Sequence, residues 1–124
     1  MIKSFLLIEC LLLTVFLSGC DSCDKWLNEF AKVEIEGTIE RVILHHKNHD
    51  SQRVHIRHKN GELSDYDFSG TNFDFLLYIR KGDIIYKKKG SLKVKIIRDS
   101  RVKHFTISCL KKSDPVPHEF YYRQ

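Results

Sequence analysis

Apolar and polar residues alternate along most of the chain after residue 33, with the period of strands that bury one face. The alternation predicts six strands, and turn signals such as Asn60-Gly61 and Asp99-Ser100 separate them. The predicted strands are 33–47, 53–59, 62–68, 84–89, 92–98 and 101–110. Gly37 interrupts the first of them, which predicts a bulge that changes the buried face.

The last two strands have a predicted register. With Asp99-Ser100 as a two-residue loop, Val94 lies opposite Phe105 and Leu92 lies opposite Ile107. This register brings apolar residues together on one face, which favours it over the neighbouring alternatives.

Helical spacing occurs in two short stretches. Trp26, Leu27 and Phe30 form one apolar face within 21–32, and 72–80 has a similar period over one or two turns. The predicted fold is therefore all-β with minor α content, and its second helix lies between strands three and four. This order is similar to the OB-fold, and we expect a small six-stranded OB-like or SH3-like barrel, closed or nearly closed.

The N-terminus has the pattern of an export signal. Lys3 precedes a 13-residue apolar run, Phe5–Leu17. A membrane-spanning helix needs about 20 apolar residues, so this run suits a signal peptide better than a span. The residues that follow, Leu17-Ser18-Gly19-Cys20, resemble the lipobox of bacterial lipoproteins.

The lipobox resemblance implies a specific modification. Diacylglycerol would alkylate the thiol of Cys20, the peptide would be cut before it, and the acylated Cys20 would anchor the chain. The implied location is the bacterial cell envelope, on the inner or outer membrane. The alternatives are an ordinary cleaved signal, with Cys20 unmodified, or an uncleaved anchor. The resulting organisation is a signal peptide (1–19), an acylated tether with a short helix (20–32), the barrel (33–112) and a C-terminal tail (113–124).

Two cysteines, Cys23 and Cys109, remain in the mature chain once Cys20 is acylated. The envelope is oxidising, which favours a disulfide between them. The alternative is a pair of free, buried thiols.

Histidines cluster between residues 45 and 58. If 48–52 forms the loop, Lys47 lies opposite Arg53 and His45 lies opposite His55. His45, His55 and the loop residue His49 would then form a candidate zinc or copper site. Lys and Arg neighbours repel a cation, so exposed histidines on a basic face are the competing interpretation.

Charge is distributed unevenly along the chain, whose net charge is +5. Residues 80–112 contain 12 basic and 2 acidic side chains, whereas 20–79 contain 7 basic and 11 acidic ones. The basic strands predict an anion-binding surface, and a solvated face that discourages edge pairing is the alternative. The candidate anion-binding residues are Lys47, Arg53, Arg57, Lys87, Lys93 and Lys95.

The composition and the absence of common motifs exclude several classes of protein. With 42% hydrophobic and 30% charged residues, the chain is neither disordered nor a multi-span membrane protein. It has none of the common hydrolase, phosphate-binding or zinc-protease motifs, so we expect no enzyme and no cofactor. The stretch 77–98 resembles small envelope lipoproteins with no assigned activity, and this resemblance implies no reaction.

The sequence thus predicts a non-enzymatic binding or structural module on the envelope membrane. Its expected partner is an envelope protein or an anionic polymer such as a glycan, and nucleic acid is not expected. The alternative function is metal binding through the clustered histidines.

Overall fold

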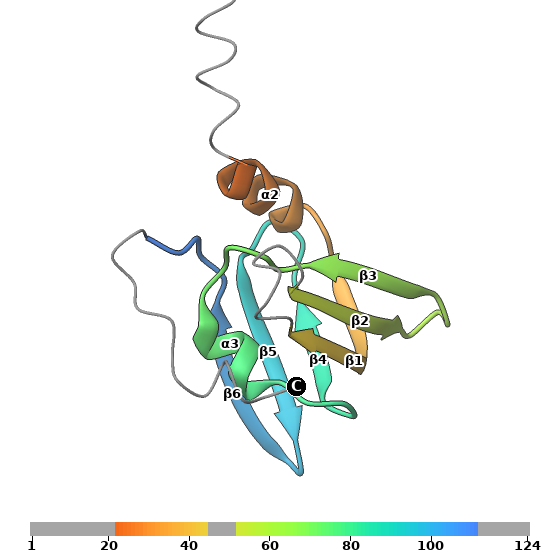
Figure 1. The fold of residues 1–124 in the computed structure, drawn as a ribbon. Coiled ribbons are helices and arrows are strands. Elements are labelled where there is room, and N and C mark those ends of the chain that lie inside the picture. The colour runs from red at the N-terminus through yellow and green to blue at the C-terminus, as the bar shows by residue number, and fades with distance from the viewer. Residues whose placement is uncertain (1–21, 45–51, 112–124) are drawn as a thin grey trace, which may run out of the picture.

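The computed structural model describes residues 22–44 and 52–111, which form one antiparallel sheet and two short helices (Figure 1). The elements are α2 (Ser22–Ala31), β1 (Ile35–Leu44), β2 (Gln52–His58), β3 (Leu63–Asp67), α3 (Phe73–Tyr78), β4 (Ile84–Lys87), β5 (Lys93–Arg98) and β6 (Arg101–Thr106). The strand order in the sheet is β3-β2-β1-β4-β5-β6. The predicted β-rich class, the six strands and the helix between β3 and β4 are confirmed.

Helix α2 packs on the domain through the apolar face that the sequence predicts. Phe30 is buried, and Trp26 and Leu27 are partly buried against the core. The Trp26 ring stacks on Phe30 at 4.7 Å between centroids and meets Phe68 edge-on at 5.2 Å. The helix is therefore a lid over one end of the sheet (Figure 1) and is part of the folded domain.

β1 joins the two halves of the sheet, since it pairs with β2 on one side and β4 on the other. The prediction of a bulge at Gly37 is wrong. The bulge in β1 lies between Ile39 and Arg41. Gly37 has a different role. A Cβ atom there would lie 2.2 Å from the carbonyl oxygen of Arg57, so only glycine allows this close approach of β1 and β2.

The predicted register of the first hairpin is wrong by four residues. His55 lies opposite Arg41 instead of His45, and Arg53 lies opposite Ile43 instead of Lys47. A shift by an even number leaves each side chain on its predicted face. Alternating apolar residues determine that face but do not determine how far the two strands slide along each other.

The last hairpin has the predicted register. Val94 lies opposite Phe105, and the Ile107 N–H donates to the Leu92 carbonyl at 3.0 Å. Asp99 and Ser100 both have positive φ, at 50° and 66°, as a two-residue loop that matches the twist of the strands requires.

The sheet is not closed into a barrel, in contrast to the prediction, because β3 and β6 do not pair along their length. β3 has only five residues, and the chain then turns into α3, which lies between the two edges (Figure 1). Near α2 the edges are joined by a single bridge, Thr71–Cys109. Asn72, which precedes α3, contributes there too. Its side chain makes no cap hydrogen bond; its amide instead donates to the Thr106 carbonyl and its oxygen accepts from the Ser108 N–H.

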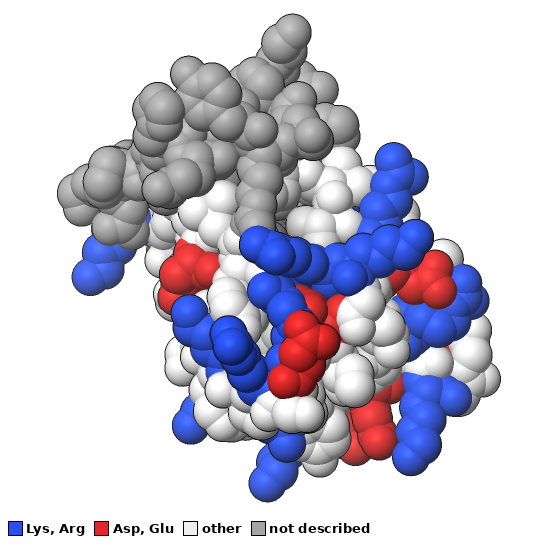
Figure 2. Space-filling view, turned by 90° about the horizontal axis from the view of Figure 1, so that it is seen from below, with Lys and Arg blue, Asp and Glu red and all other residues white. Residues whose placement is uncertain are grey.

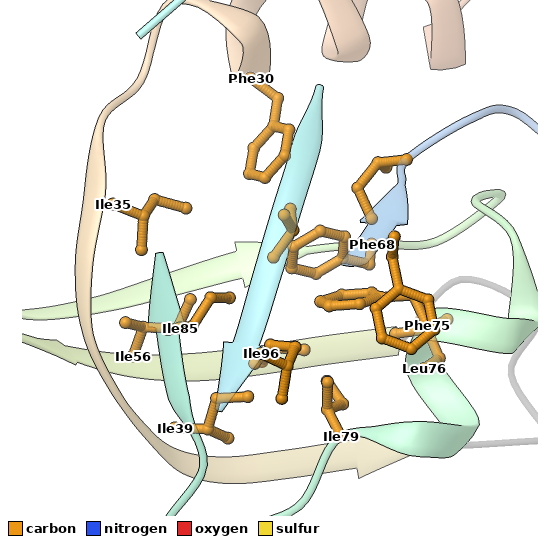
Figure 3. Packing of buried hydrophobic residues seen from close by; sticks show 14 of the residues in the cluster. Phe30, Ile35, Ile39, Ile56, Phe68, Phe75, Leu76, Ile79, Ile85 and Ile96 are labelled. Carbon is orange, nitrogen blue, oxygen red and sulfur yellow. The ribbon is translucent and has the colours of Figure 1, made fainter. Parts of the chain in front are cut away.

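The core fills the space that the curved sheet and the two helices enclose (Figure 3). Aromatic rings from α2, the end of β3, α3 and β6 form a continuous series through it, with Phe68 in contact with Phe30 and Phe75. Aliphatic residues of the strands complete the packing; the fully buried ones are Ile35, Ile39, Val54, Ile56, Ile85, Val94 and Ile96. This face of the sheet therefore supports the fold, and the side chains that alternate with it form the outer face.

Candidate binding surface

The predicted metal site is not assembled by the described residues. His45 and His49 lie outside them, and His55 faces the carboxylate of Asp65 at 3.5 Å. No group of three or more His, Cys, Asp or Glu side chains that could hold a metal occurs within 22–44 and 52–111.

The predicted basic residues of β2 are neutralised by neighbouring strands. The Arg53 guanidinium pairs with Asp65 of β3 at 2.9 Å, and that of Arg57 pairs with Glu40 of β1 at 3.0 Å. Hydrogen bonding to Arg57, against a smaller opposing effect of burial, lowers the pKa of Glu40. Lys47, the remaining candidate near this hairpin, lies outside the described residues.

Lys87 was predicted to face outward, but its side chain is fully buried. Its ammonium donates to the carbonyls of Ser91, Lys88 and Ala31 at 2.9, 3.0 and 3.3 Å, and it lies 5.0 Å from the Phe30 ring centroid. Burial lowers the pKa of Lys87. The residue fastens the C-terminal end of α2 to the β4–β5 turn and is not part of a surface. Alternation places Lys87 on the inner face with the buried Ile85, and the long side chain keeps its charge there because three backbone carbonyls converge on the ammonium.

A buried ion pair supports the opposite end of the domain. Asp83 is almost fully buried and accepts two hydrogen bonds from Arg98, at 2.7 and 2.6 Å, and one from the Arg80 N–H at 2.8 Å. Burial alone would raise the pKa of Asp83, but these hydrogen bonds outweigh it and lower the pKa. Arg98 also donates to the Tyr78 carbonyl and packs on the Tyr78 ring, so β5 is tied to α3.

Lys93 and Lys95 lie together on the outer face of β4–β5–β6, which we call the outer basic face. Its members alternate with the buried residues of the same strands. They are Ile84, Tyr86, Lys93, Lys95, Ile97, Val102, His104 and Thr106. Lys95 lies over the Tyr86 ring at 5.1 Å from its centroid and opposite His104 of β6.

Apart from Arg98, which pairs with Asp83, the cations of β5 and β6 lack acidic partners among the described residues. In the described part of the chain, Lys93, Lys95, Arg101 and Lys103 form no ion pair with any carboxylate. Lys103 instead packs on the Tyr78 and Phe105 rings at the rim of the core. Figure 2 views the molecule from the end opposite α2, where Lys and Arg side chains are widespread and acidic ones are fewer. Because Lys93 and Lys95 form no ion pair in the described residues, the outer basic face is suited to an anionic ligand.

Sequence reasoning missed the apolar members of the outer basic face. Ile84 and Val102 are among the exposed large hydrophobic residues, and Ile97 lies between them in the sheet. The predicted turn at Asp99-Ser100 already places Ile97 opposite Val102, so the hairpin register was the signal that could have found this pair.

Cys23 of α2 and Cys109 beyond β6 form a disulfide in the structure. The bond joins the helix to the strand end that lies across the open side of the sheet, next to the Thr71–Cys109 bridge. Cys20 lies outside the described residues, three positions before Cys23. A disulfide suits an oxidising compartment.

Comparison with known proteins found no matching family model, no matching curated protein and no matching solved structure. Neither α2 nor α3, the helices within the described residues, is long and apolar enough to cross a membrane.

Proposed function

We propose that the chain is a non-enzymatic binding module of the bacterial cell envelope, anchored through acylated Cys20, whose outer basic face binds an anionic partner. The observation that carries the binding function is the distribution of paired and unpaired charge. Cations on β2 have carboxylate partners at 2.9 and 3.0 Å, whereas Lys93 and Lys95 have none in the described residues. Unpaired cations on one face attract anionic partners and accelerate their association.

The anchor rests on the Leu17-Ser18-Gly19-Cys20 motif, and the Cys23–Cys109 disulfide supports the same compartment. The intact mass of the chain extracted from its native membrane tests this part of the proposal. A chain that begins at Cys20 and carries acyl chains is expected. An uncut chain without added acyl mass would contradict the anchor.

The fold supports an open, OB-like arrangement for this module. The position of α3 between β3 and β4, on which the OB-like prediction rested, supports this arrangement, and so does the pairing of β1 with both β2 and β4. Fold likeness does not define a ligand, so the proposed function depends on the surface alone.

Titration with polyglutamate, a simple polyanion, tests the binding. The acylated chain is reconstituted in phosphatidylcholine vesicles, and the double variant Lys93→Glu/Lys95→Glu is expected to weaken binding about tenfold at low salt. The matched control is Lys32→Glu/Lys59→Glu, which makes the same charge change at two exposed lysines that have acidic partners. Equal weakening by both double variants would show that only net charge matters and would contradict a defined surface.

A further inference from the structure

An aliphatic row crosses the outer basic face, with an exposed residue at each end and a partly buried one between them. Ile84 of β4 lies opposite Ile97 of β5, and Ile97 lies opposite Val102 of β6. Ile84 is 48% exposed and Val102 is 54% exposed. Single exposed aliphatic residues are common on protein surfaces, but three neighbours in one cross-strand row form a continuous stripe.

Among the described residues, the three members of the row belong neither to the buried core nor to the side chains packed against it. The opposite face of the same strands supplies Ile85, Ile96 and Phe105 to the core. As far as the described residues go, the exposed side chains of Ile84 and Val102 therefore remain available for contact with a partner.

Polar members of the surface border the row on one side only. Tyr86, Lys95 and His104 form the adjacent cross-strand row, and Lys93 follows on β5. Every charged side chain of this face on β4–β5–β6 is basic or histidine. A partner that covers the aliphatic row would thus place its neighbouring side chains against cations, which favours carboxylates there.

The row lies at the end of the domain away from α2. The β4–β5 turn contacts the end of α2, where the Gly90 N–H donates to the Ala31 carbonyl at 2.6 Å. Ile97 and Val102 flank the opposite turn of the same sheet (Figure 1). Cys20 precedes the disulfide-bonded Cys23 by three positions, a reach of about 10 Å. An acyl anchor at Cys20 would hold the α2 end at the bilayer, so the membrane that carries the chain is not the occupant of the row.

The spacing of the row fits one secondary structure. Neighbouring strands lie about 4.8 Å apart, so three residues in a row span about 10 Å. An α-helix advances about 10.5 Å from position i to i+7, with side chains at i, i+3 or i+4 and i+7 on one face. A helix laid across the strands can therefore place one aliphatic side chain on each member of the row.

We propose that the row Ile84–Ile97–Val102 docks an acidic amphipathic helix of a partner protein, with carboxylates beside the helix's apolar stripe facing Lys93 and Lys95. This inference rests on the proposed function and specifies its partner as a protein instead of an anionic glycan, which would leave the aliphatic row unused. A second copy of this chain is a poor occupant, because two identical faces would oppose lysine with lysine.

Two synthetic peptides of identical composition test the proposal. One is an 18-residue helix of Leu, Ala and Glu whose leucines form a single stripe flanked by glutamates. The other is a permuted peptide with the same residues and charge but no stripe. Binding to the acylated chain in phosphatidylcholine vesicles is followed by fluorescence anisotropy, and the striped peptide is expected to bind about tenfold more tightly.

Surface variants show which side chains cause the preference for the striped peptide. Ile84→Thr/Val102→Thr keeps β-branched side chains and is expected to abolish the preference for the striped peptide while binding of the permuted peptide persists. Leu63→Thr is the matched control, since Leu63 is an equally exposed aliphatic residue (51%) on β3, and it should leave the preference unchanged. Lys93→Glu/Lys95→Glu should weaken binding of both peptides.

The possible failures are distinguishable. Equal affinity of the wild-type chain for the two peptides, or an unchanged preference in Ile84→Thr/Val102→Thr, overturns the helix-docking inference and leaves anion binding intact. Failure of the wild-type chain to bind polyglutamate and both peptides overturns the proposed function and this inference together.

Discussion

The outer faces of the two halves of the sheet differ in whether their basic side chains form ion pairs. On β1–β2–β3, arginines of the middle strand pair with carboxylates of the strands beside it. On β4–β5–β6, outer lysines have no carboxylate partner in the described residues, and aliphatic side chains lie beside them. A count of basic residues therefore does not identify a binding surface, because carboxylates on neighbouring strands pair with some of the cations and not with others.

The disulfide at the open side of the sheet, which joins α2 to the segment after β6, should show the largest effect. Cys23→Ala/Cys109→Ala removes a bond between residues separated by 86 positions and is expected to lower the free energy of unfolding by about 4 kcal/mol. Urea unfolding measures the change, and reduction of the wild-type chain should reproduce it. Unchanged unfolding midpoints would mean that the Thr71–Cys109 bridge and the core suffice to hold the halves together.

Ion pairs in the two halves should differ in energy. Asp83→Ala leaves the Arg98 guanidinium without its buried partner and is expected to cost about 3 kcal/mol. Asp65→Ala, which removes an exposed partner of Arg53, should cost less than about 1 kcal/mol. Thermal unfolding of both variants makes the comparison, and equal losses would contradict the distinction between a buried and an exposed pair.

The same pair predicts a pH dependence. The pKa of Asp83 is lower in the folded chain than in the unfolded one, so its contribution to stability is complete above the unfolded pKa. It is lost as the pH falls through the folded pKa. Stability of the wild-type chain should therefore decline in acid more steeply than that of Asp83→Asn, as urea titrations at several pH values would measure. Parallel declines would assign the acid sensitivity to other carboxylates.

Gly37, at the junction of the halves, should show an intermediate effect. Gly37→Ala forces the Arg57 carbonyl away from a Cβ that would lie 2.2 Å from it and is expected to cost about 2 kcal/mol. Gly61→Ala is a useful contrast, because nothing lies near its added Cβ and any loss comes from its positive φ alone. Hydrogen exchange should show weakened β1–β2 hydrogen bonds in Gly37→Ala; exchange that matches the wild type would show that the strands accommodate the methyl group.

The smallest effect should come from the lysines of the outer basic face. Lys93→Ala/Lys95→Ala is expected to change the free energy of unfolding by no more than about 0.5 kcal/mol, because surface cations without acidic partners in the described residues add little stability. Arg53→Ala/Arg57→Ala, which removes two cross-strand pairs, should cost about 1 kcal/mol. Chemical denaturation measures both, and a larger loss in the lysine variant would indicate a structural role for that face.

Part of the fold could be predicted because local patterns determine it. The helix at Trp26 and Phe30, the turn at Asp99-Ser100 and the Val94–Phe105 register each depend on residues close in the chain. The first hairpin lacked such a short turn, so its register was four residues wrong, and His55 met Arg41 instead of His45. The candidate site was predicted in part, since Lys93 and Lys95 share the outer face. Lys87 does not belong to it: alternation puts this residue on the inner face with Ile85, and the carbonyls that accept its charge come from segments that the strand pattern does not show.

The sequence by itself determined which residues alternate, where the tight turns fall and that Leu17-Ser18-Gly19-Cys20 resembles a lipobox, because these depend on neighbours along the chain. Only the tertiary structure decided that the sheet stays open and that the Lys87 ammonium is buried against the end of α2. It also decided that the arginines of β2 form ion pairs with carboxylates of β1 and β3. Each of these outcomes depends on contacts between segments far apart in the sequence. Local periodicity carries information about which face a side chain occupies, but none about which distant group it will meet there.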